Sequence, residues 1–377
     1  MSERRLLGRA FVDGMIKDDI VVTIRGAAIA DVGQVTHASA VERVRGLIVP
    51  GLIDMHIHGG AGADFMDGDE KANARVLKFH ARNGTTAVAA TTLSGSVSDL
   101  HKAVRAIAAT ANNKPPGAEI CAVHLEGPYI NLRHAGAQDA ASIRPANIQE
   151  VGLLIVEAPR LRFIITLAPE LEGARALIEH YRSKVLFSIG HTSADHSEAV
   201  AALEWGASHF THLFNAMTGM HHREPGVVGA ALASADATAE LIADGVHVHP
   251  VVLRIATTLL PHRVALITDA IRACGMPDGK YKLYDHDINV AEGSARLVSG
   301  TLAGSVLTMS RAVQNMVELA GLPIEKVIPL ATEVPARILG VADRKGKLER
   351  GYDADVLVLS EKFEVDRVYA RGEEVTS

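Results

Sequence analysis

The chain has 377 residues, of which 48% are hydrophobic and 4% aromatic, and its formal net charge is −6 at pH 7. This length suits one large barrel or two domains, and the mixed, slightly acidic charge excludes the basic stripe of a nucleic-acid-binding protein. MSERRLLGRAFVDG (1–14) lacks the apolar core of a signal peptide, and no apolar run is long enough to span a bilayer. Cys121 and Cys274 form no disulfide framework. We therefore expect a cytoplasmic protein with neither nucleic-acid nor membrane partners.

Short apolar runs rich in β-branched residues alternate with helical patterns along most of the chain. EKANARVLKFHARNG (70–84), for example, has apolar residues at helical spacing and ends in Asn-Gly, a common helix stop. Eight such runs predict strands, at 47–58, 85–93, 119–127, 162–170, 184–192, 207–215, 239–248 and 263–271. This alternation predicts an α/β protein with a (β/α)8 TIM barrel, for which about 250 residues are typical. A doubly wound sheet is the alternative, because a strand count does not establish closure.

The two ends of the chain do not follow this alternation. VVTIRGAAIADVGQV (21–35) is typical of two strands around a turn, and residues 346–375 are again strand-like with turn residues between. We predict that residues 1–47 and 346–377 pair into a small β-sandwich domain and that residues 48–345 form the barrel. The stretch 272–303, rich in Gly and Asp, predicts a long loop or hairpin after the eighth strand.

The first predicted barrel strand ends in two imidazoles. In PGLIDMHIHGG (50–60), His56 and His58 are one residue apart, so in a strand they point to the same face, together with Asp54. The glycines that follow allow the backbone to turn away. Two converging imidazoles suggest a metal site, but a pair alone does not establish one.

Polar residues at the ends of the other strands strengthen this hypothesis. Barrel active sites form at the carboxyl ends of the strands, and there the sequence has Glu126 in HLEGP, His191 in IGHT, His212 in THLFNAM and Asp269 in ITDA. Imidazoles and carboxylates in this number suit one or two divalent metals of the zinc or iron type. A single histidine is more often structural, and we interpret the others in this way: His124, His209, His221, His222 and His249.

Longer motifs add a resemblance. The chain resembles the N-acetylglucosamine-6-phosphate deacetylases of the amidohydrolase superfamily over nearly its full length. The matching segments are PGLIDMHIHGG, HLEGPYINLRHAGAQ, GHTSAD, THLFNAMTGMHHREPG, ADGVHV, ITDAI, GTLAGS and GKLERGYDADVLVL. HLEGP, THLFNAM and REPG together are specific to this group, whereas the HxH pair indicates only the superfamily.

The resemblance implies roles for the residues at the strand ends. Glu126, His191 and His212 match the principal metal ligands, and Asp269 matches the general base. Because the HxH pair is kept, it also implies a second metal at His56 and His58. We therefore expect one or two divalent cations per subunit, zinc before iron.

The same resemblance implies a sugar-phosphate site. The arginine of REPG, Arg223, is supplied in the family by a neighbouring subunit, which implies a homodimer. Gln138 stands where part of the family has a histidine, and glutamine can donate a hydrogen bond but cannot carry a proton. More of the carbonyl polarisation is then left to the metal. The expected substrate-binding residues are Ala137, Gln138, Asn215, Ala216, Arg223, His247, Leu302, Ala303 and Gly304.

The implied reaction is hydrolysis of the acetamide of N-acetylglucosamine 6-phosphate to glucosamine 6-phosphate and acetate. A metal-bound hydroxide would attack the carbonyl, and Asp269 would transfer the proton to the departing amine. Three alternatives remain. The substrate could be the 4-epimer, N-acetylgalactosamine 6-phosphate. A hydrolase of cyclic amides or phosphoesters would not need Arg223, and a non-catalytic sugar-phosphate sensor would be expected to lose ligands or the base, all of which are present.

Overall fold

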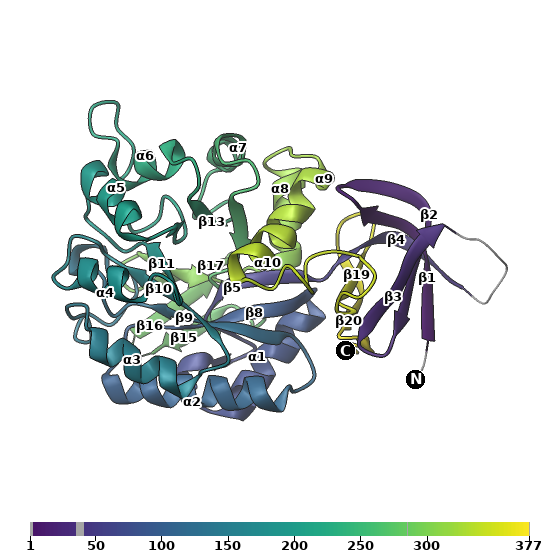
Figure 1. Ribbon diagram of the computed structural model, residues 1–377, viewed down its shortest axis with the longest axis horizontal. Helices are drawn as coiled ribbons and strands as arrows, with labels where there is room; N and C mark the ends of the chain where they lie inside the picture. The colour runs from purple at the N-terminus through teal and green to yellow at the C-terminus, as the bar shows by residue number, and fades with distance from the viewer. Residues whose placement is uncertain (1–2, 35–40, 285, 377) are drawn as a thin grey trace.

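A barrel and a smaller sheet make up the computed structural model, which describes residues 3–34, 41–284 and 286–376 (Figure 1). Eight parallel strands form the barrel sheet in the order β14-β13-β12-β11-β10-β9-β8-β5. Their bounds are β5 (Leu52–Ile57), β8 (Thr85–Thr92), β9 (Glu119–Glu126), β10 (Arg162–Leu167), β11 (Val185–Ile189), β12 (His209–Phe210), β13 (Thr238–Ile242) and β14 (Val264–Ile267).

Hydrogen bonds between the two ends of this sheet close the barrel. The amide of Asp269, just after β14, donates to the carbonyl of His56 on β5 (2.9 Å), and the amide of His58 donates to the carbonyl of Ala270 (2.9 Å). The predicted TIM barrel is therefore confirmed, and the open doubly wound sheet is wrong. The strands are buried throughout most of their length, as expected for parallel strands covered by helices, and this explains their continuous apolar runs.

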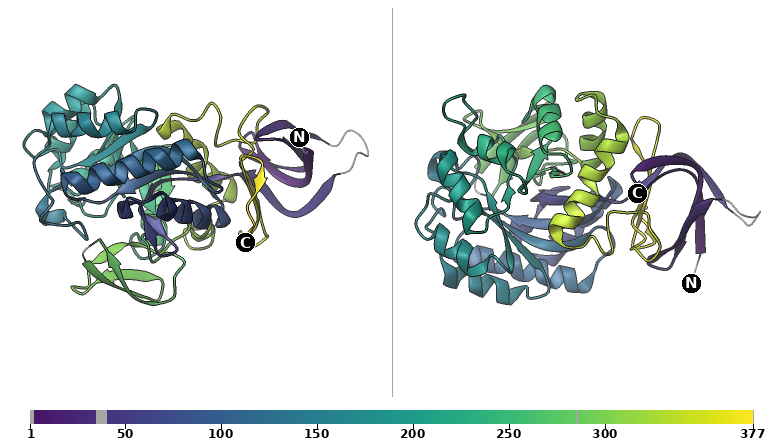
Figure 2. Two further views of the ribbon diagram at one scale, coloured as in Figure 1. Left: turned by 90° about the horizontal axis from the view of Figure 1, so that it is seen from below. Right: turned by 45° about the horizontal axis from the view of Figure 1, so that its top comes forward.

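Helices surround the barrel strands (Figures 1 and 2). Several begin at the side-chain caps typical of helix starts; in α5, Asp195 and Glu198 form a reciprocal capping box. No helix within the described ranges is long and apolar enough to cross a membrane. The helices are α1 (Glu70–Arg82), α2 (Val97–Asn113), α3 (Ile148–Glu157), α4 (Ala174–Tyr181), α5 (His196–Trp205), α6 (Gly226–Ala233), α7 (Pro250–Leu259), α8 (Met309–Glu318), α9 (Ile324–Val327) and α10 (Glu333–Leu339), with 3-10 turns η1 (Phe65–Asp67), η2 (Leu132–His134) and η3 (Ile328–Ala331).

The two chain ends share one curled sheet beside the barrel (Figure 2). Its seven strands run in the order β21-β20-β19-β4-β1-β2-β3, so both ends contribute, as predicted, to a single continuous hydrogen-bonded sheet. It encloses its own small core, which includes Leu6, Ile48 and Tyr369. The strands are β1 (Glu3–Val12), β2 (Met15–Arg25), β3 (Ala28–Gln34), β4 (Glu42–Pro50), β19 (Val356–Leu359), β20 (Val365–Ala370) and β21 (Glu373–Glu374).

The first predicted strand, 47–58, is in fact two strands in two different sheets. β4 belongs to the small sheet and runs to Pro50, so the expected domain boundary at residue 47 falls inside it. β5 begins the barrel at Leu52. Gly51 lies between them, where a Cβ atom would come within 2.2 Å of Thr86 Oγ1. The chain thus changes sheets at the one residue small enough to pass Thr86.

The loop or hairpin expected over 272–303 is a four-stranded antiparallel sheet. It consists of β15 (Gly279–Leu283), β16 (His286–Ala291), β17 (Ser294–Leu297) and β18 (Leu302–Ser305). At its end, the amide of Ser305 donates to the carbonyl of Asp269 (2.8 Å). This excursion therefore returns to the mouth of the barrel, beside the end of β14. A further two-stranded piece, β6 (Gly59–Gly60) with β7 (Ala63–Asp64), follows β5.

Candidate metal centre and active site

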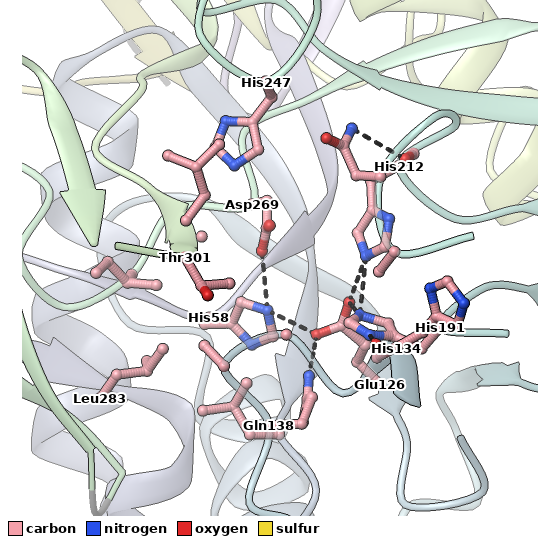
Figure 3. A pocket seen from close by; sticks show the side chains of 18 of the residues that line it. His58, Glu126, His134, Gln138, His191, His212, His247, Asp269, Leu283 and Thr301 are labelled. Atoms are coloured by element: carbon pink, nitrogen blue, oxygen red, sulfur yellow. Dashed lines mark hydrogen bonds and ion pairs between the residues drawn. The ribbon is translucent and has the colours of Figure 1, made fainter. Parts of the chain in front are cut away.

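The strand-end residues predicted to bind metal converge in one buried cluster (Figure 3). Glu126 is the last residue of β9, whereas His191, His212 and Asp269 each lie two residues beyond the end of a strand. All three of these have positive φ angles, 50°, 28° and 51°, which are uncommon for residues other than glycine. The backbone therefore turns sharply as each strand ends, and the three side chains lie in the barrel mouth.

Glu126, His191 and His212 form the first candidate metal group. Oε1 of Glu126 lies 3.1 Å from His191 Nε2 and 3.0 Å from His212 Nε2, and these two nitrogens are 3.0 Å apart. When unprotonated, the two imidazole nitrogens would offer lone pairs to the same point as the carboxylate oxygen. A divalent cation satisfies all three lone pairs at once, so the donor set fits a zinc-type ion.

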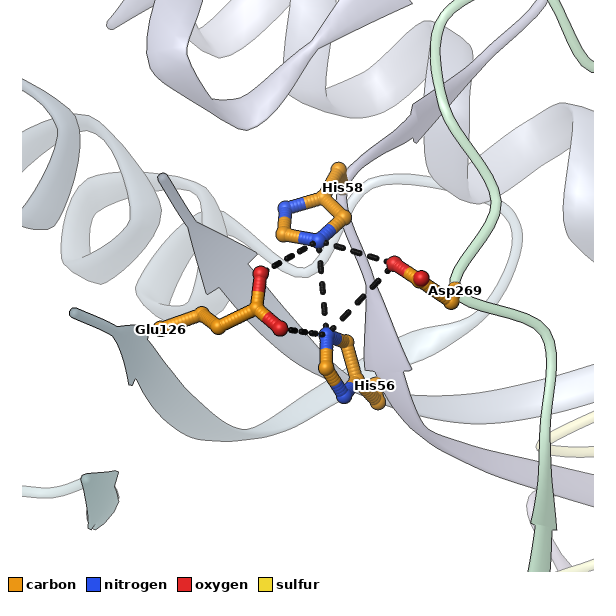
Figure 4. A group of neighbouring side chains, drawn as sticks. All are labelled: His56, His58, Glu126 and Asp269. Carbon is orange, nitrogen blue, oxygen red and sulfur yellow. Dashed lines mark hydrogen bonds and ion pairs between the residues drawn. The ribbon is translucent and has the colours of Figure 1, made fainter. Parts of the chain in front are cut away.

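A second candidate group shares Glu126 with the first and consists of His56, His58, Glu126 and Asp269 (Figure 4). His56 Nε2 lies 3.2 Å from Glu126 Oε1, and His58 Nε2 lies 3.2 Å from Glu126 Oε2. Oδ1 of Asp269 is 3.1 Å from His58 Nε2. Glu126 therefore offers oxygen atoms to both groups, the arrangement of a carboxylate that could bridge two cations.

The charges in this cluster compensate one another. Burial acts to raise the pKa of Glu126, but His56 and His191 hold it well below its ordinary value. Burial acts to lower the pKa of His58, but hydrogen bonds with Asp269 and Glu126 raise it to about 9. Burial acts to raise the pKa of Asp269, but its hydrogen bond with His58 and the charges of His56 and His58 together lower it. Metal and protons therefore compete for the same nitrogens.

A pocket of about 340 Å³ opens above the cluster. Seven of the nine predicted substrate-binding residues line it: Ala137, Gln138, Asn215, Ala216, His247, Leu302 and Gly304. Ala303 is buried but is not among the lining residues. Arg223 is exposed, bonds to His222 Nε2 through its Nη1 (2.6 Å) and lines a neighbouring cavity, with which the pocket shares His134. Within one chain, Arg223 does not reach the pocket.

Gln138 is held tightly by its neighbours. Its Oε1 accepts a hydrogen bond from the amide of Ser94 (2.6 Å), and its Nε2 donates to Glu126 Oε2 (2.6 Å). The Ser94 bond fixes which end of the side-chain amide faces the cluster. One N–H of Gln138 is therefore used by the candidate ligand Glu126, and the second remains for a substrate.

Two acidic residues at the site were missed in the sequence. Glu240, on β13, is fully buried and bonds to His56 Nδ1 (2.9 Å), and Asp244 bonds to His247 Nδ1 (2.6 Å). Both lie in AELIADGVHV, and an acidic residue within an apolar run is ordinarily interpreted as solvent-exposed. Of the histidines interpreted as structural, His124 bonds to Thr166 (2.7 Å), and burial lowers its pKa to about 3, so it stays neutral.

Comparisons with known proteins agree with this geometry. A family model described as "Amidohydrolase family" matches residues 47–375. N-acetylgalactosamine-6-phosphate deacetylase from Escherichia coli O157:H7 is 38% identical over 357 residues, 94% of each chain. N-acetylglucosamine-6-phosphate deacetylase from Bacillus subtilis is 39% identical over 331 residues, 86% of this chain and 84% of its own.

Solved structures show the same likeness. A mutant N-acetyl-D-glucosamine-6-phosphate deacetylase from Mycobacterium smegmatis, in complex with N-acetyl-D-glucosamine-6-phosphate, superposes with a TM-score of 0.94 over 100% of both chains at 32% identity. The deacetylase from Thermotoga maritima gives 0.87 at 31% identity, covering 100% of this chain and 99% of its own. The closed barrel, the strand-end cluster and these matches together show that the chain belongs to the amidohydrolase family.

Proposed function

We propose that the protein is an N-acetylglucosamine-6-phosphate deacetylase, which hydrolyses the acetamide to give glucosamine 6-phosphate and acetate. The observation that carries the proposal is the position of Asp269. Its carboxylate belongs to the second candidate metal group and also lines the pocket that His247 lines. A water-activating group and a phosphate-binding group thus face the same space, and relatives that act on this substrate match nearly the whole chain.

We propose zinc as the cation, with iron second, and one or two ions per subunit. Glu126, His191 and His212 would hold the tight ion, and His56 and His58 the weaker one. When bound, the cation lowers the pKa of a coordinated water toward about 7 and stabilises negative charge on the amide oxygen. The mixed imidazole and carboxylate donors support this choice over magnesium or calcium.

Asp269 would act as general base and then as general acid. Its lowered pKa keeps the carboxylate ionised at neutral pH, so Oδ1 can accept a proton from the attacking water. Because an amine leaves poorly unless protonated, the same carboxyl group then donates this proton to the departing nitrogen. Gln138, held by Ser94, can donate its free N–H to the acetamide and so orient it.

The phosphate would be bound by His247 and Arg223. Burial acts to lower the pKa of His247, but its bond with Asp244 raises it, so the imidazole can carry a positive charge beside the pocket. Arg223 would come from a second subunit of a homodimer, which is consistent with its place outside the pocket of its own chain. A guanidinium binds phosphate through a two-pronged hydrogen-bonded fork. The two free cysteines, Cys121 and Cys274, are consistent with a cytoplasmic location.

One specific observation supports a second candidate substrate, N-acetylgalactosamine 6-phosphate. A deacetylase of that sugar matches 94% of the chain at 38% identity. The two substrates differ only in the orientation of one hydroxyl, so the same metal, base and phosphate groups would serve both. The choice between them would fall to the residues that line the sugar portion of the pocket.

An acetate-release assay on both 6-phosphates, combined with elemental analysis of the purified protein, tests the proposal. We expect acetate from N-acetylglucosamine 6-phosphate at a kcat/KM above that for its epimer, with at least one zinc or iron per chain. A higher kcat/KM for the galacto epimer would reassign the substrate and leave the chemistry unchanged. Full activity in a metal-free preparation would overturn the mechanism.

A further inference from the structure

Glu240 is a fully buried carboxylate behind the second candidate metal group. Its Oε2 accepts hydrogen bonds from His56 Nδ1 (2.9 Å) and from the backbone amide of His212 (3.0 Å). Its Oε1 lies 3.3 Å from His209 Nε2. In the described part of the chain, no Lys or Arg forms an ion pair with Glu240. A buried carboxylate without a permanently charged partner is costly, so its contacts with the histidines must explain why it is there.

We propose that Glu240 is a positioning residue for both metal groups. It would hold the proton of His56 on Nδ1, leaving Nε2 free for the second metal, and it would anchor the backbone of His212 at the first. The inference rests on the proposed metal ligands and adds a residue that touches neither metal nor substrate.

Hydrogen-bond chemistry sets the orientation of His56. An ionised carboxylate can only accept hydrogen bonds, so the contact between Glu240 Oε2 and His56 Nδ1 requires a proton on Nδ1. An imidazole that binds a metal is neutral and carries one N–H, so with this proton on Nδ1 the lone pair of Nε2 is free. That nitrogen lies 3.3 Å from His58 Nε2 and 3.2 Å from Glu126 Oε1, inside the second group (Figure 4). The bond to Glu240 and the position of the metal ligands therefore require the same tautomer.

The second contact of Glu240 concerns the backbone of His212. This residue has a φ of 28°, an uncommon conformation for a residue with a side chain. Its amide donates to Glu240, while its Nε2 lies 3.0 Å from Glu126 Oε1. The hydrogen bond thus holds the turn that directs the imidazole toward Glu126. One carboxylate supports a ligand of each metal group.

Substituting Glu240 by Met and by Gln distinguishes a hydrogen-bonding role from a role in filling space. Glu240→Met has a similar length but no acceptor, so both N–H groups lose their partner. We expect the second zinc to bind about 10- to 100-fold more weakly, the usual effect of losing a group that orients a ligand. In Glu240→Gln the amide oxygen can still accept from His56, while the NH2 turns toward His209. This variant should recover most of the affinity.

The measurement is zinc titration against a competing chelator, with bound zinc counted by elemental analysis and the fold checked by circular dichroism. Ser188→Ala is the matched control, because it removes a buried hydroxyl that bonds to Thr211 (2.5 Å) in the same barrel interior. It should bind zinc like the native protein. Two zincs of native affinity in Glu240→Met would overturn this inference alone. A single zinc in the native protein would overturn the two-metal proposal and this inference with it.

A measurement without variants at Glu240 covers the case in which Glu240→Met fails to fold. In the zinc-loaded native protein with ¹⁵N-labelled histidines, the His56 signal, assigned by its loss in His56→Gln, should show Nδ1 protonated and Nε2 bound to metal. A proton on Nε2 of His56 would contradict the proposal.

Discussion

Strand β9 begins at a partly buried carboxylate, Glu119, and ends at a buried one, Glu126, and the two are neutralised in opposite ways. Glu119 pairs with permanent cations, Arg344 (2.7 Å) and Lys345 (3.0 Å). Glu126 is surrounded by the imidazoles of the two metal groups, and no Lys or Arg of the described ranges forms an ion pair with it.

The difference indicates that the Glu119 end of β9 serves stability and that the Glu126 end serves function. At the Glu119 end, the Lys345 side chain is fully buried and also bonds to Asp353 (2.9 Å) and Asp355 (2.6 Å), so the charges are largely balanced within the protein. At the Glu126 end, the described side chains that pair with the carboxylate are imidazoles, which can release their protons to a metal. This agrees with the general division of barrels into a stabilising face and a catalytic face.

The largest expected effect is the loss of activity in Glu126→Gln. A neutral amide removes the charge shared by both metal groups, and loss of metal forfeits several kcal/mol of charge stabilisation, about 10³-fold or more in kcat/KM. Acetate release and bound zinc should fall together. Glu119→Gln, at the other end of the strand, is the control and should keep both while losing stability. If Glu126→Gln retained its zinc, Glu126 would not be a ligand.

Asp269→Asn should impair proton transfer without abolishing metal binding in the cluster around Glu126. Asparagine is nearly isosteric but cannot accept the proton, and loss of a general base typically costs about 10²–10⁴-fold, here in kcat. At least the tight zinc should remain, as measured by elemental analysis. Near-native kcat at neutral pH would mean that another residue is the base.

Lys345→Met should remove the ion pairs at the Glu119 end of β9 and so destabilise the fold. It leaves Glu119, Asp353 and Asp355 with less cationic compensation, and breaking a buried ion pair costs about 3–5 kcal/mol. Urea unfolding should show this loss, while kcat of the folded enzyme should stay near native. Lys347→Met is the matched control, because Lys347 is exposed. Equal stability of the two variants would show that the buried cluster contributes little.

Low pH should lower the free energy of unfolding by protonating Glu119, over a pH range that follows from the pKa of this residue. Burial acts to raise the pKa of Glu119, but Arg344 and Lys345 lower it to about 2, against an ordinary value of 4.5. The stabilisation is therefore complete above about pH 4.5 and is lost as the pH falls toward 2; it is on the order of 3 kcal/mol. Urea unfolding of metal-free protein at pH 5 and pH 3 measures it. The same pH dependence in Glu119→Gln would assign it to other groups.

The smallest expected effect is that of substituting Arg223, which would reach the active site from a second subunit. A charge-assisted hydrogen bond contributes about 1.5–3 kcal/mol, so Arg223→Ala should lower kcat/KM about ten- to a hundred-fold on the 6-phosphate. The change should be small on unphosphorylated N-acetylglucosamine. Mixing Arg223→Ala with Asp269→Asn subunits should restore some activity if Arg223 crosses a dimer. An equal loss on both sugars would make Arg223 structural.

The sequence predicted the fold well because strands and helices alternate with different periods. The prediction failed where one continuous apolar run contains strands of two different sheets. The apolar run through Gly51 hid the change of sheet, because both neighbouring strands are buried there. The ends of β11, β12 and β14 were predicted two or more residues too long, because His191, His212 and Asp269 leave the strand by positive φ angles that composition does not reveal.

The candidate site was predictable to the extent that strand ends identify it. His56 and His58 follow from the two-residue period, and Glu126 follows from its place at the carboxyl end of its predicted strand. Glu240 could not be found in this way, because all but the first residue of β13 are buried and no alternation marks an inward face. The partners of buried acids, such as Asp244 with His247, depend on turns that only the structure supplies.

The single residue between β4 and β5 has a consequence for synthesis of the chain on the ribosome. β4 pairs with β19, Leu47 opposite Leu359, so the small sheet lacks three of its strands until residues 356–374 have been synthesised. The strand that carries His56 and His58 is attached to this unfinished sheet. Such long-range pairing slows folding and leaves strand edges open to aggregation. A nascent chain stopped before β19 should therefore depend on chaperones, even though every strand of the barrel has already been made.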